Sequence, residues 1–300
     1  MSASDHSALQ NIRDFIRYGA SRFSEAGLCF GHGTDNALDE AAWLVLYALQ
    51  LPLTVSGHWW DARLTPVEKQ RVMAVLDERI HTRKPAAYIT GEAFFMGLPF
   101  HVDERVLVPR SPLAEPISDG FAPWLEVDSV ERVLDLCTGS GCIGIACAMV
   151  FDNAQVDLAD ISDDALAVAQ KNIQRHGLQD RVKTWQADVF QGLPATTYDL
   201  IVSNPPYVDA QDMAALTPEF RHEPALGLAA GEDGLDVVSR ILAEAGVRLS
   251  EQGVLVVEVG NSAPAVEARW PDVPFVWLEF SQGGEGVFLL TADVVRAFFP

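Results

Sequence analysis

Apolar residues recur with a helical period in three stretches near the start of the chain. Residues 5–26, 36–49 and 65–83 each carry an apolar stripe with a spacing of about 3.6 residues, the period of one helix face. The third stretch opens with Thr65-Pro66-Val67-Glu68, where Thr and Glu can form a capping box and Pro suits the first helical position. The pattern predicts a small helical bundle over residues 1–84, which either recognises a substrate or serves as a structural cap.

The pattern changes over residues 85–120, where prolines interrupt the chain. Two β-like runs, 93–102 and 106–108, lie among them. Short strand-like runs separated by turn-forming residues predict a linker that contains a β-hairpin. The prolines are Pro85, Pro99, Pro109, Pro112 and Pro116.

From about residue 130 onward, strand-like and helix-like stretches alternate, which predicts a parallel sheet with helices on both faces. The predicted strands cover 132–136, 155–159, 182–186, 199–203 and 253–259, and the predicted helices cover 142–151, 163–176 and 235–249. Two last strands, 273–279 and 286–291, are joined across Gln282-Gly283-Gly284-Glu285 without room for a crossover helix, so they must run antiparallel. Residues 121–300 are therefore predicted to form an α/β domain with a Rossmann-like, doubly wound, seven-stranded sheet whose last strand is antiparallel. This arrangement resembles a class I S-adenosylmethionine-dependent methyltransferase.

A glycine-rich loop follows the first predicted strand of this sheet and opens a helix. Glycines let the backbone turn tightly and approach a ligand at the carboxyl edge of the sheet, where open α/β folds bind cofactors. Asp160 ends the second strand and can accept both hydroxyls of an adenosine ribose, while Asp188 follows the third strand and can accept an adenine amino group. Ile161 and Val189, their neighbours, are assigned to the same cofactor site. The loop residues are Asp135, Leu136, Cys137, Thr138, Gly139, Ser140 and Gly141.

The same loop satisfies the dinucleotide pattern GxGxxG through Gly139, Gly141 and Gly144. Asp135 distinguishes the two cofactors. A carboxylate just before the glycines would repel a pyrophosphate, yet it suits the cationic sulfonium and the amino group of S-adenosylmethionine. The predicted cofactor is therefore S-adenosylmethionine, and an NAD-dependent oxidoreductase is an alternative.

Ser203-Asn204-Pro205-Pro206-Tyr207 directly follows the fourth predicted strand. An amide or exocyclic amino nitrogen is a poor nucleophile because its lone pair is delocalised, so an enzyme must hold its N–H bonds and aim the lone pair at the methyl group. The Asn204 side-chain oxygen can accept one N–H and the Pro205 carbonyl the other. Pro205 and Pro206 fix the direction of that carbonyl, and Tyr207 offers a ring for stacking. These four residues are the predicted catalytic set, Asn204 also borders the cofactor, and they would act by in-line positioning.

The charge of the chain limits its partners. The 300 residues include 21 Lys and Arg against 42 Asp and Glu, a net charge of −21. Residues 1–120 hold 11 basic and 15 acidic side chains, whereas residues 121–300 hold 10 and 27. An acidic catalytic half should repel nucleic acid and attract basic proteins or cationic ligands, so we expect no direct DNA binding. Most of the surplus carboxylates can also be explained without any partner, because they keep a protein soluble.

Four cysteines, Cys29, Cys137, Cys142 and Cys147, do not suit a secreted disulfide framework in a chain of this length. Their spacing completes no zinc set, so no metal site is predicted, and Cys137, Cys142 and Cys147 are interpreted as small buried residues. The first residues lack a basic region followed by an apolar stretch, and the longest apolar run, residues 41–49, is too short to span a bilayer. We expect a cytoplasmic protein without membrane attachment, and the sequence leaves its oligomeric state open.

Several motifs together point to a family. The glycine loop with Asn-Pro-Pro-Tyr at 204–207 resembles methyltransferases that act on planar nitrogens, which include DNA adenine enzymes and protein glutamine enzymes. The segments 88–97, 106–112, 222–226 and 231–235, with Glu258-Val259-Gly260, resemble protein N5-glutamine methyltransferases. This resemblance covers nearly the whole chain. It implies methyl transfer from S-adenosylmethionine to the side-chain amide nitrogen of a glutamine in a protein.

Within that family the sequence resembles the branch that modifies the third protein of the large ribosomal subunit. Release-factor enzymes usually carry Gly at the position of Cys137 and Pro at the position of Ser111, and Trp277-Leu278-Glu279-Phe280 also resembles the ribosomal-protein branch. The resemblance implies a basic ribosomal protein as substrate. The alternatives are a release-factor glutamine methyltransferase, a DNA or RNA adenine-N6 methyltransferase, and a factor that binds S-adenosylmethionine without turnover.

Overall fold

The computed structural model describes residues 8–281 and 283–300, and contacts within the chain divide it into two units. Unit 1 comprises the residues up to Glu92 together with the short segment Thr217–His222. Unit 2 comprises Ala93–Leu216 and Glu223–Pro300. Within the described residues, no helix is both long and apolar enough to cross a membrane.

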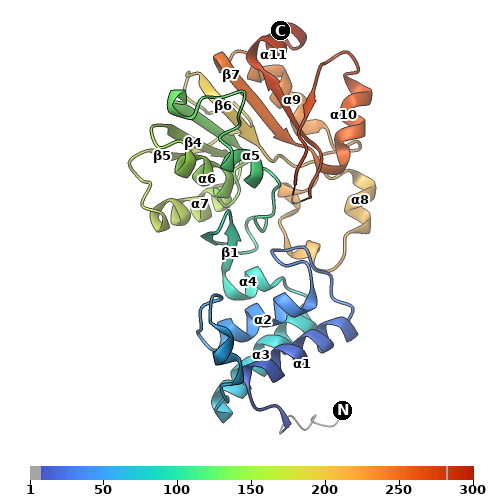
Figure 1. The fold of residues 1–300 in the computed structure, drawn as a ribbon. Helices are drawn as coiled ribbons and strands as arrows, with labels where there is room; N and C mark the ends of the chain where they lie inside the picture. The colour runs from blue at the N-terminus through green and yellow to red at the C-terminus, as the bar shows by residue number, and fades with distance from the viewer. Residues whose placement is uncertain (1–7, 282) are drawn as a thin grey trace. The chain divides into compact units, whose positions relative to one another are not determined.

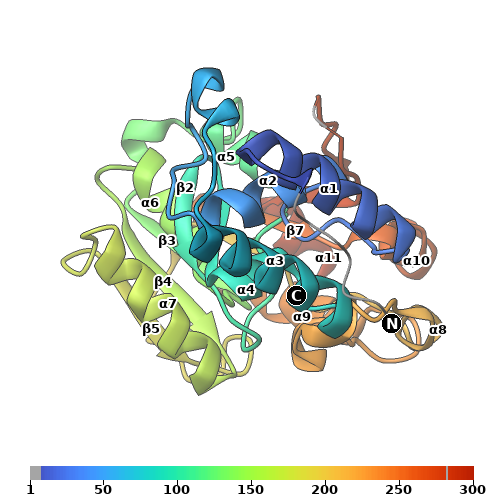
Figure 2. The same ribbon diagram turned by 90° about the horizontal axis from the view of Figure 1, so that it is seen from below.

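Unit 1 is built from helices whose starts are set by side-chain caps. Helices α1 (Ile12–Glu25), α2 (Ala37–Ala48) and α3 (Pro66–Thr82) pack side by side (Figures 1 and 2), with the turn η2 (Gly57–Asp61) before α3 and the short helix α4 (Ala86–Thr90) after it. Asn11 and Asp14 cap each other's backbone N–H, so α1 begins at Ile12 and not at residue 5. Residues 5–7 of the predicted helix lie outside the described residues. The predicted capping box of Thr65 and Glu68 is confirmed at α3.

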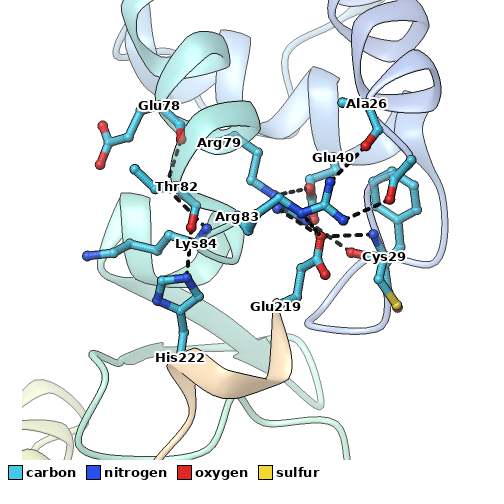
Figure 3. Close-up of polar contacts among 12 residues, drawn as sticks. Ala26, Cys29, Glu40, Glu78, Arg79, Thr82, Arg83, Lys84, Glu219 and His222 are labelled. Carbon is cyan, nitrogen blue, oxygen red and sulfur yellow. Dashed lines mark hydrogen bonds and ion pairs between the residues drawn. The ribbon is translucent and has the colours of Figure 1, made fainter. Parts of the chain in front are cut away.

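A buried carboxylate holds the segment Thr217–His222 inside unit 1. Glu219 is fully buried, and its Oε1 lies 2.8 Å from Arg83 Nε and 3.7 Å from Arg79 Nη1. The same oxygen accepts a hydrogen bond from the Cys29 N–H at 3.0 Å (Figure 3). Arg79 is also fully buried, and it donates to Glu40 at 2.7 Å. Because buried charges are costly unless they are paired, this set of side chains fixes one arrangement of α2, α3 and the segment.

Two further groups tie the segment and its surroundings together. His222 Nε2 lies 2.9 Å from the carbonyl of Thr82 at the end of α3. Arg83 donates to the carbonyls of Ala26 and Gly27, which follow α1, at 2.8 Å each (Figure 3). The chain thus enters unit 1 for a second time after helix α8 (Ala210–Ala215) and leaves it at His222.

Within the described part of unit 2, seven strands form one mixed sheet in the order β5-β4-β3-β6-β7-β9-β8. The strands β5, β4, β3, β6 and β7 are parallel, whereas β9 runs antiparallel to both β7 and β8. The predicted Rossmann-like sheet with an antiparallel last strand is confirmed. The strands are β3 (Arg132–Leu136), β4 (Gln155–Asp160), β5 (Val182–Gln186), β6 (Tyr198–Ser203), β7 (Leu249–Glu258), β8 (Val276–Trp277) and β9 (Val287–Thr291).

Alternate residues of the central strands face opposite layers of helices. Helices α6 (Cys142–Val150) and α7 (Asp163–Arg175) cover one face, and α9 (Asp236–Ala245), α10 (Ala263–Arg269) and α11 (Ala292–Phe298) cover the other (Figure 1). Leu134 and Leu136 of β3 pack in the same buried cluster as Val238 of α9. Asp135, which lies between them in the sequence, faces α6 because successive side chains of a strand point to opposite faces.

The linker and some element limits differ from the predictions. The hairpin is confirmed, but β1 (Glu92–Phe95) and β2 (Leu98–His101) form it, and residues 106–108 are not a strand. The Val108 N–H donates to the Glu223 carboxylate, which takes the place of a strand partner. Helix α9 ends at Ala245 because Leu249 already belongs to β7, opposite Tyr198. Gln282 of the predicted turn lies outside the described residues. The remaining short elements are α5 (Ala114–Ser118), η3 (Val127–Ser129), η4 (Phe220–His222), η5 (Ala225–Gly227) and η6 (Gly260–Ser262).

We predict that Glu219→Gln destabilises unit 1. The substitution removes the negative charge that pairs with Arg83 and leaves the buried Arg79 with Glu40 alone, and breaking a buried ion pair costs about 3 kcal/mol. Thermal unfolding should show a lower midpoint, and hydrogen exchange should show faster opening of α3. Glu78→Gln, an exposed change on the same helix, is the matched control and should shift stability by less than about 0.5 kcal/mol. Equal stability of the two variants would contradict the role of Glu219.

Candidate active site

A cavity of about 320 Å³ lies inside unit 2 at the carboxyl ends of the parallel strands. Its volume is in the range of sites for small ligands. Among the predicted site residues, Asp135, Gly141 and Pro205 do not line it. The predicted residues that it brings together are Cys137, Thr138, Gly139, Ser140, Asp160, Ile161, Asp188, Val189, Asn204, Pro206 and Tyr207.

Asp160, at the end of β4, holds the glycine loop. Its Oδ2 accepts the Gly139 N–H and its Oδ1 accepts the Ser162 N–H, both at 2.9 Å. Burial raises the pKa of the Asp160 carboxyl, although these two N–H groups act in the opposite direction. A carboxylate has about four acceptor positions, so Asp160 keeps some of them for a ligand in the cavity that it lines.

Asp135 is fully buried beneath α6 and does not reach the cavity wall. Its Oδ2 accepts the Thr138 hydroxyl at 2.5 Å and the Gly144 N–H at 2.9 Å, and burial raises its pKa to about 7. A Cβ on Gly144 would lie 2.2 Å from Leu158 Cδ2 and 2.9 Å from Asp135 Cβ, so glycine is required there for helix and strand to pack. The bonds that the structure gives Asp135 thus go to the loop and to α6, while its contact with a cofactor remains a prediction.

Asp188 lines the cavity with its carboxylate already paired. Its Oδ1 accepts from Arg240 Nη1 of α9 at 2.7 Å, and this hydrogen bond lowers the pKa of the Asp188 carboxyl. Both side chains are about half exposed. Arg240 is not among the predicted site residues, because nothing in its local pattern connects it to a residue far away in the chain. A ligand amino group at Asp188 would share the carboxylate with this arginine.

Tyr207 is fixed at both its ring and its backbone. A Cβ on Gly260 would lie 2.7 Å from Tyr207 Cε2, so the ring packs directly on the glycine backbone. The Ser262 hydroxyl donates to the Tyr207 carbonyl at 2.8 Å. The Ser203 hydroxyl donates to the Leu136 carbonyl at 2.8 Å, which ties the end of β6 to the end of β3. These contacts position the segment Asn204–Tyr207 beside the glycine loop.

Asn172 of α7 is a second residue that sequence analysis missed. It is fully buried, and its Nδ2 donates to the carbonyls of Ser140 at 2.8 Å and His101 at 3.0 Å. Its Oδ1 accepts the His101 N–H at 2.7 Å. One amide therefore joins the glycine loop to the end of the hairpin. A single Asn in a helical pattern gives no signal of this, since most Asn side chains are exposed.

The linker segment from Arg105 to Ser111 forms another side of the cavity. Arg110 forms an ion pair with the buried carboxylate of Glu223, and its Nη2 donates to Glu223 Oε2 at 2.7 Å. The Val108 N–H donates to the other oxygen of the same carboxylate at 3.0 Å. The sequence motifs at 106–112 and 222–226 are thus in contact with each other through the Glu223 carboxylate.

The cysteines of this region differ in their surroundings. Cys142 and Cys147 are buried as predicted, but Cys137 is half-buried and lines the cavity. Cys137 has a φ of 57°, a left-handed conformation that glycine adopts without strain. Removal from water and the carboxylates of Asp160 and Asp135 raise the pKa of its thiol well above the ordinary range, so the thiol stays neutral.

The residues of the cavity fit an adenosyl cofactor. Asp160 offers acceptors for a ribose diol, and Asp188 offers one for an amino group. Ile161, Val189 and Val237 add apolar surface of the kind that a planar base packs against. Gly139 leaves open space where a Cβ would stand, so a ligand can approach the loop backbone.

Comparison with known proteins agrees with this geometry. A model described as "Methyltransferase small domain" matches residues 118–268, and one described as "PrmC N-terminal domain" matches residues 14–91. Together with the sheet order, these matches define a class I methyltransferase, whose methyl donor is S-adenosylmethionine.

Relatives at high identity define the family. A ribosomal protein uL3 glutamine methyltransferase of Bordetella pertussis is 50% identical, over 98% of this chain and 99% of the relative. Proteins of the same name from Francisella tularensis and Neisseria gonorrhoeae are 49% and 50% identical, over 95% of this chain and 91% and 95% of theirs. The chain belongs to the family of ribosomal protein uL3 glutamine methyltransferases. The predicted family and its ribosomal-protein branch are confirmed.

Solved structures align less closely. A methyltransferase from Pyrococcus furiosus is 18% identical with a TM-score of 0.47, over 65% of this chain and 89% of that one. A human methyltransferase 10 domain containing protein is 20% identical with a TM-score of 0.47, over 66% and 89%. The strand order of the chain itself, and not these alignments, defines its fold.

We predict that Cys137→Gly keeps both cofactor affinity and turnover within about twofold while raising stability by about 1 kcal/mol. Glycine relieves the left-handed strain, and the neutral thiol has no chemical task in the cavity. Calorimetry, a methyl-transfer assay and thermal unfolding measure the three quantities. Loss of turnover with a normal fold would show that the thiol is needed.

Proposed function

We propose that this protein transfers a methyl group from S-adenosylmethionine to the side-chain amide nitrogen N5 of a glutamine in ribosomal protein uL3. The observation that carries the proposal is that Asn204 and Tyr207 line one cavity with Asp160 and the glycine loop. An acceptor amide and a methyl donor can therefore meet within a single site. The relatives at about 50% identity are named for this activity.

The cofactor site would be formed by the ends of three neighbouring strands. Asp160 would bind the ribose hydroxyls, Asp188 the adenine amino group, and the loop Cys137–Gly141 the methionine end. Asp135 would stabilise the positive charge of the ligand from beneath the loop and would act at longer range than a direct contact. The cofactor supplies an electrophilic methyl group on a sulfonium. The residues of the chain orient this methyl group and the acceptor nitrogen.

The acceptor glutamine would be held at the end of β6. Asn204 Oδ1 would accept one N–H of the glutamine amide, and the Pro205 carbonyl would accept the other. Pro206 would keep the backbone rigid, and the Tyr207 ring would pack on the planar amide. The methylated nitrogen becomes acidic and releases its proton to water, so no strong base is needed. Catalysis would come from in-line positioning.

Unit 1 and the linker would recognise the protein substrate, since the predicted chemistry needs only residues of unit 2. A net charge of −21 favours a basic partner such as a ribosomal protein, and it disfavours direct binding of DNA. We place this reaction in the cytoplasm, where ribosomal proteins are made, without membrane attachment. The same charge argues against the adenine-N6 alternative, and the names of the relatives favour uL3 over a release factor.

We predict that Asn204→Ala and Asp160→Ala fail in different ways. Asn204→Ala should lower kcat on the order of 100-fold while calorimetry shows nearly normal S-adenosylmethionine affinity, because its main role is to orient the acceptor. Asp160→Ala should weaken that affinity by about 2 kcal/mol through lost charge-assisted hydrogen bonds. Near-normal turnover in Asn204→Ala would exclude the amide clamp, and unchanged affinity in Asp160→Ala would exclude the ribose assignment.

A further prediction concerns ionic strength. Attraction between the acidic enzyme and basic uL3 should raise kcat/KM at low salt, and the effect should fade above physiological salt, where the Debye length is about 8 Å. Steady-state assays of the full-length chain at several salt concentrations measure this dependence. A short uncharged glutamine peptide is the control and should show little change. Equal salt dependence of protein and peptide would contradict recognition by charge.

A further inference from the structure

Glu258 stands at the end of β7, at the side of the cavity that Asn204 and Tyr207 also line. Only 5% of its surface is exposed. An ionised carboxylate is costly at such a place unless its oxygens receive hydrogen bonds. The mechanism above gives Glu258 no role, so its burial requires an explanation.

Each oxygen of Glu258 faces a hydroxyl donor. The Ser111 hydroxyl donates to Oε2 at 2.5 Å, and the Tyr207 hydroxyl donates to Oε1 at 3.3 Å. The Asn204 side chain lines the same cavity, close enough to this carboxylate to lower its pKa. One carboxylate therefore binds Tyr207 and lies beside Asn204, two of the four residues that we assign to catalysis.

The chemistry of the carboxylate favours one direction of the Asn204 amide. An ionised carboxylate can only accept hydrogen bonds, so the amide beside it is more stable with its NH₂ group turned toward Glu258. In that orientation Oδ1 is directed away from Glu258 and can accept from a substrate. If the Asn204 amide flipped, its NH₂ group would face the substrate amide, which also carries N–H donors. The acceptor nitrogen could then not be held.

We propose that Glu258 is a positioning residue for methyl transfer, which keeps Asn204 Oδ1 directed toward the acceptor amide and holds the Tyr207 hydroxyl, with Ser111 supporting its carboxylate. This proposal rests on the proposed function, because it assigns the acceptor-binding role to Asn204. Packing agrees with it: the Tyr207 ring lies against Gly260, two residues beyond Glu258 on the same stretch of chain.

The ionisation of Glu258 links this role to pH. Burial raises its pKa, while hydrogen bonds from Ser111 and Tyr207, the charge of Arg110 and the Asn204 side chain lower it. The neighbouring ionisable groups are Arg110 on the linker, Glu223 beside that arginine, Tyr207 after β6, and the thiol of Cys142 on α6. Turnover should therefore fall as pH drops through the pKa of Glu258. Ser111→Ala removes a group that lowers this pKa, so the acid limb of kcat should move to higher pH.

The test uses the full-length chain with uL3 and compares Glu258→Gln, Ser111→Ala and the double variant. Gln can offer its own NH₂ group to Asn204 and so allow the Asn204 amide to flip. Glu258→Gln should lower kcat on the order of 10- to 100-fold, with S-adenosylmethionine affinity and the KM for uL3 within about twofold of wild type. Ser111→Ala should shift the acid limb upward, and the same change made in Glu258→Gln should leave the pH profile unaltered. Glu251→Gln, an exposed change on β7, is the control and should behave as wild type.

The outcomes separate this proposal from the one on which it rests. Wild type that fails to methylate uL3 would overturn the proposed function itself. Active wild type with undiminished kcat in Glu258→Gln would overturn only the positioning role. If Glu258→Gln does not fold, the pH profile of Ser111→Ala decides: an upward shift supports the proposal, and an unshifted acid limb overturns it.

Discussion

The parallel register of β3, β4 and β6 is the constraint on which the site depends. Leu136 lies opposite Ala159 on one side and Ser203 on the other, so three strands end at one level. The residues that follow each strand must then share one edge of the sheet, although they are far apart in the sequence. The glycine loop, Asp160 and the segment Asn204–Tyr207 line a common cavity for this reason. A methyl donor and an acceptor nitrogen need such closeness more than they need a strong acid or base.

Three carboxylates near the carboxyl ends of strands define the electrostatics of unit 2. Asp135 and Glu258 are buried and Asp160 is half-buried, and removal from water raises the pKa of each. Their hydrogen-bonded oxygens accept from N–H groups of the glycine loop and of helix starts, or from hydroxyl groups. The negative charges therefore hold the backbone that surrounds the cavity. A cationic sulfonium would enter an environment already arranged to stabilise positive charge. The same carboxylates therefore supply the negative charge and hold the backbone around the cavity.

Site residues could be predicted from the sequence where a polar residue directly follows a recognisable strand. Asp160 and Asn204–Tyr207 could be placed because each directly follows a predictable apolar strand. The burial of Asp135 could have been inferred, since alternation along β3 sends it to the α6 face, whereas a glycine loop alone suggests a ligand contact. Asn172 and Arg240 reach the site from helices, and their partners are distant in the chain. Such pairs follow from tertiary packing, so no local period or spacing indicates them.

The most direct test of this account is to identify the product atom. Full-length uL3 is incubated with the enzyme and S-adenosylmethionine that carries an isotopically labelled methyl group, and peptides are then analysed by tandem mass spectrometry. The account predicts one labelled methyl group on the side-chain amide nitrogen of a glutamine. A label on another residue type, or on the adenines of a nucleic acid offered in the same reaction with none on uL3, would contradict it.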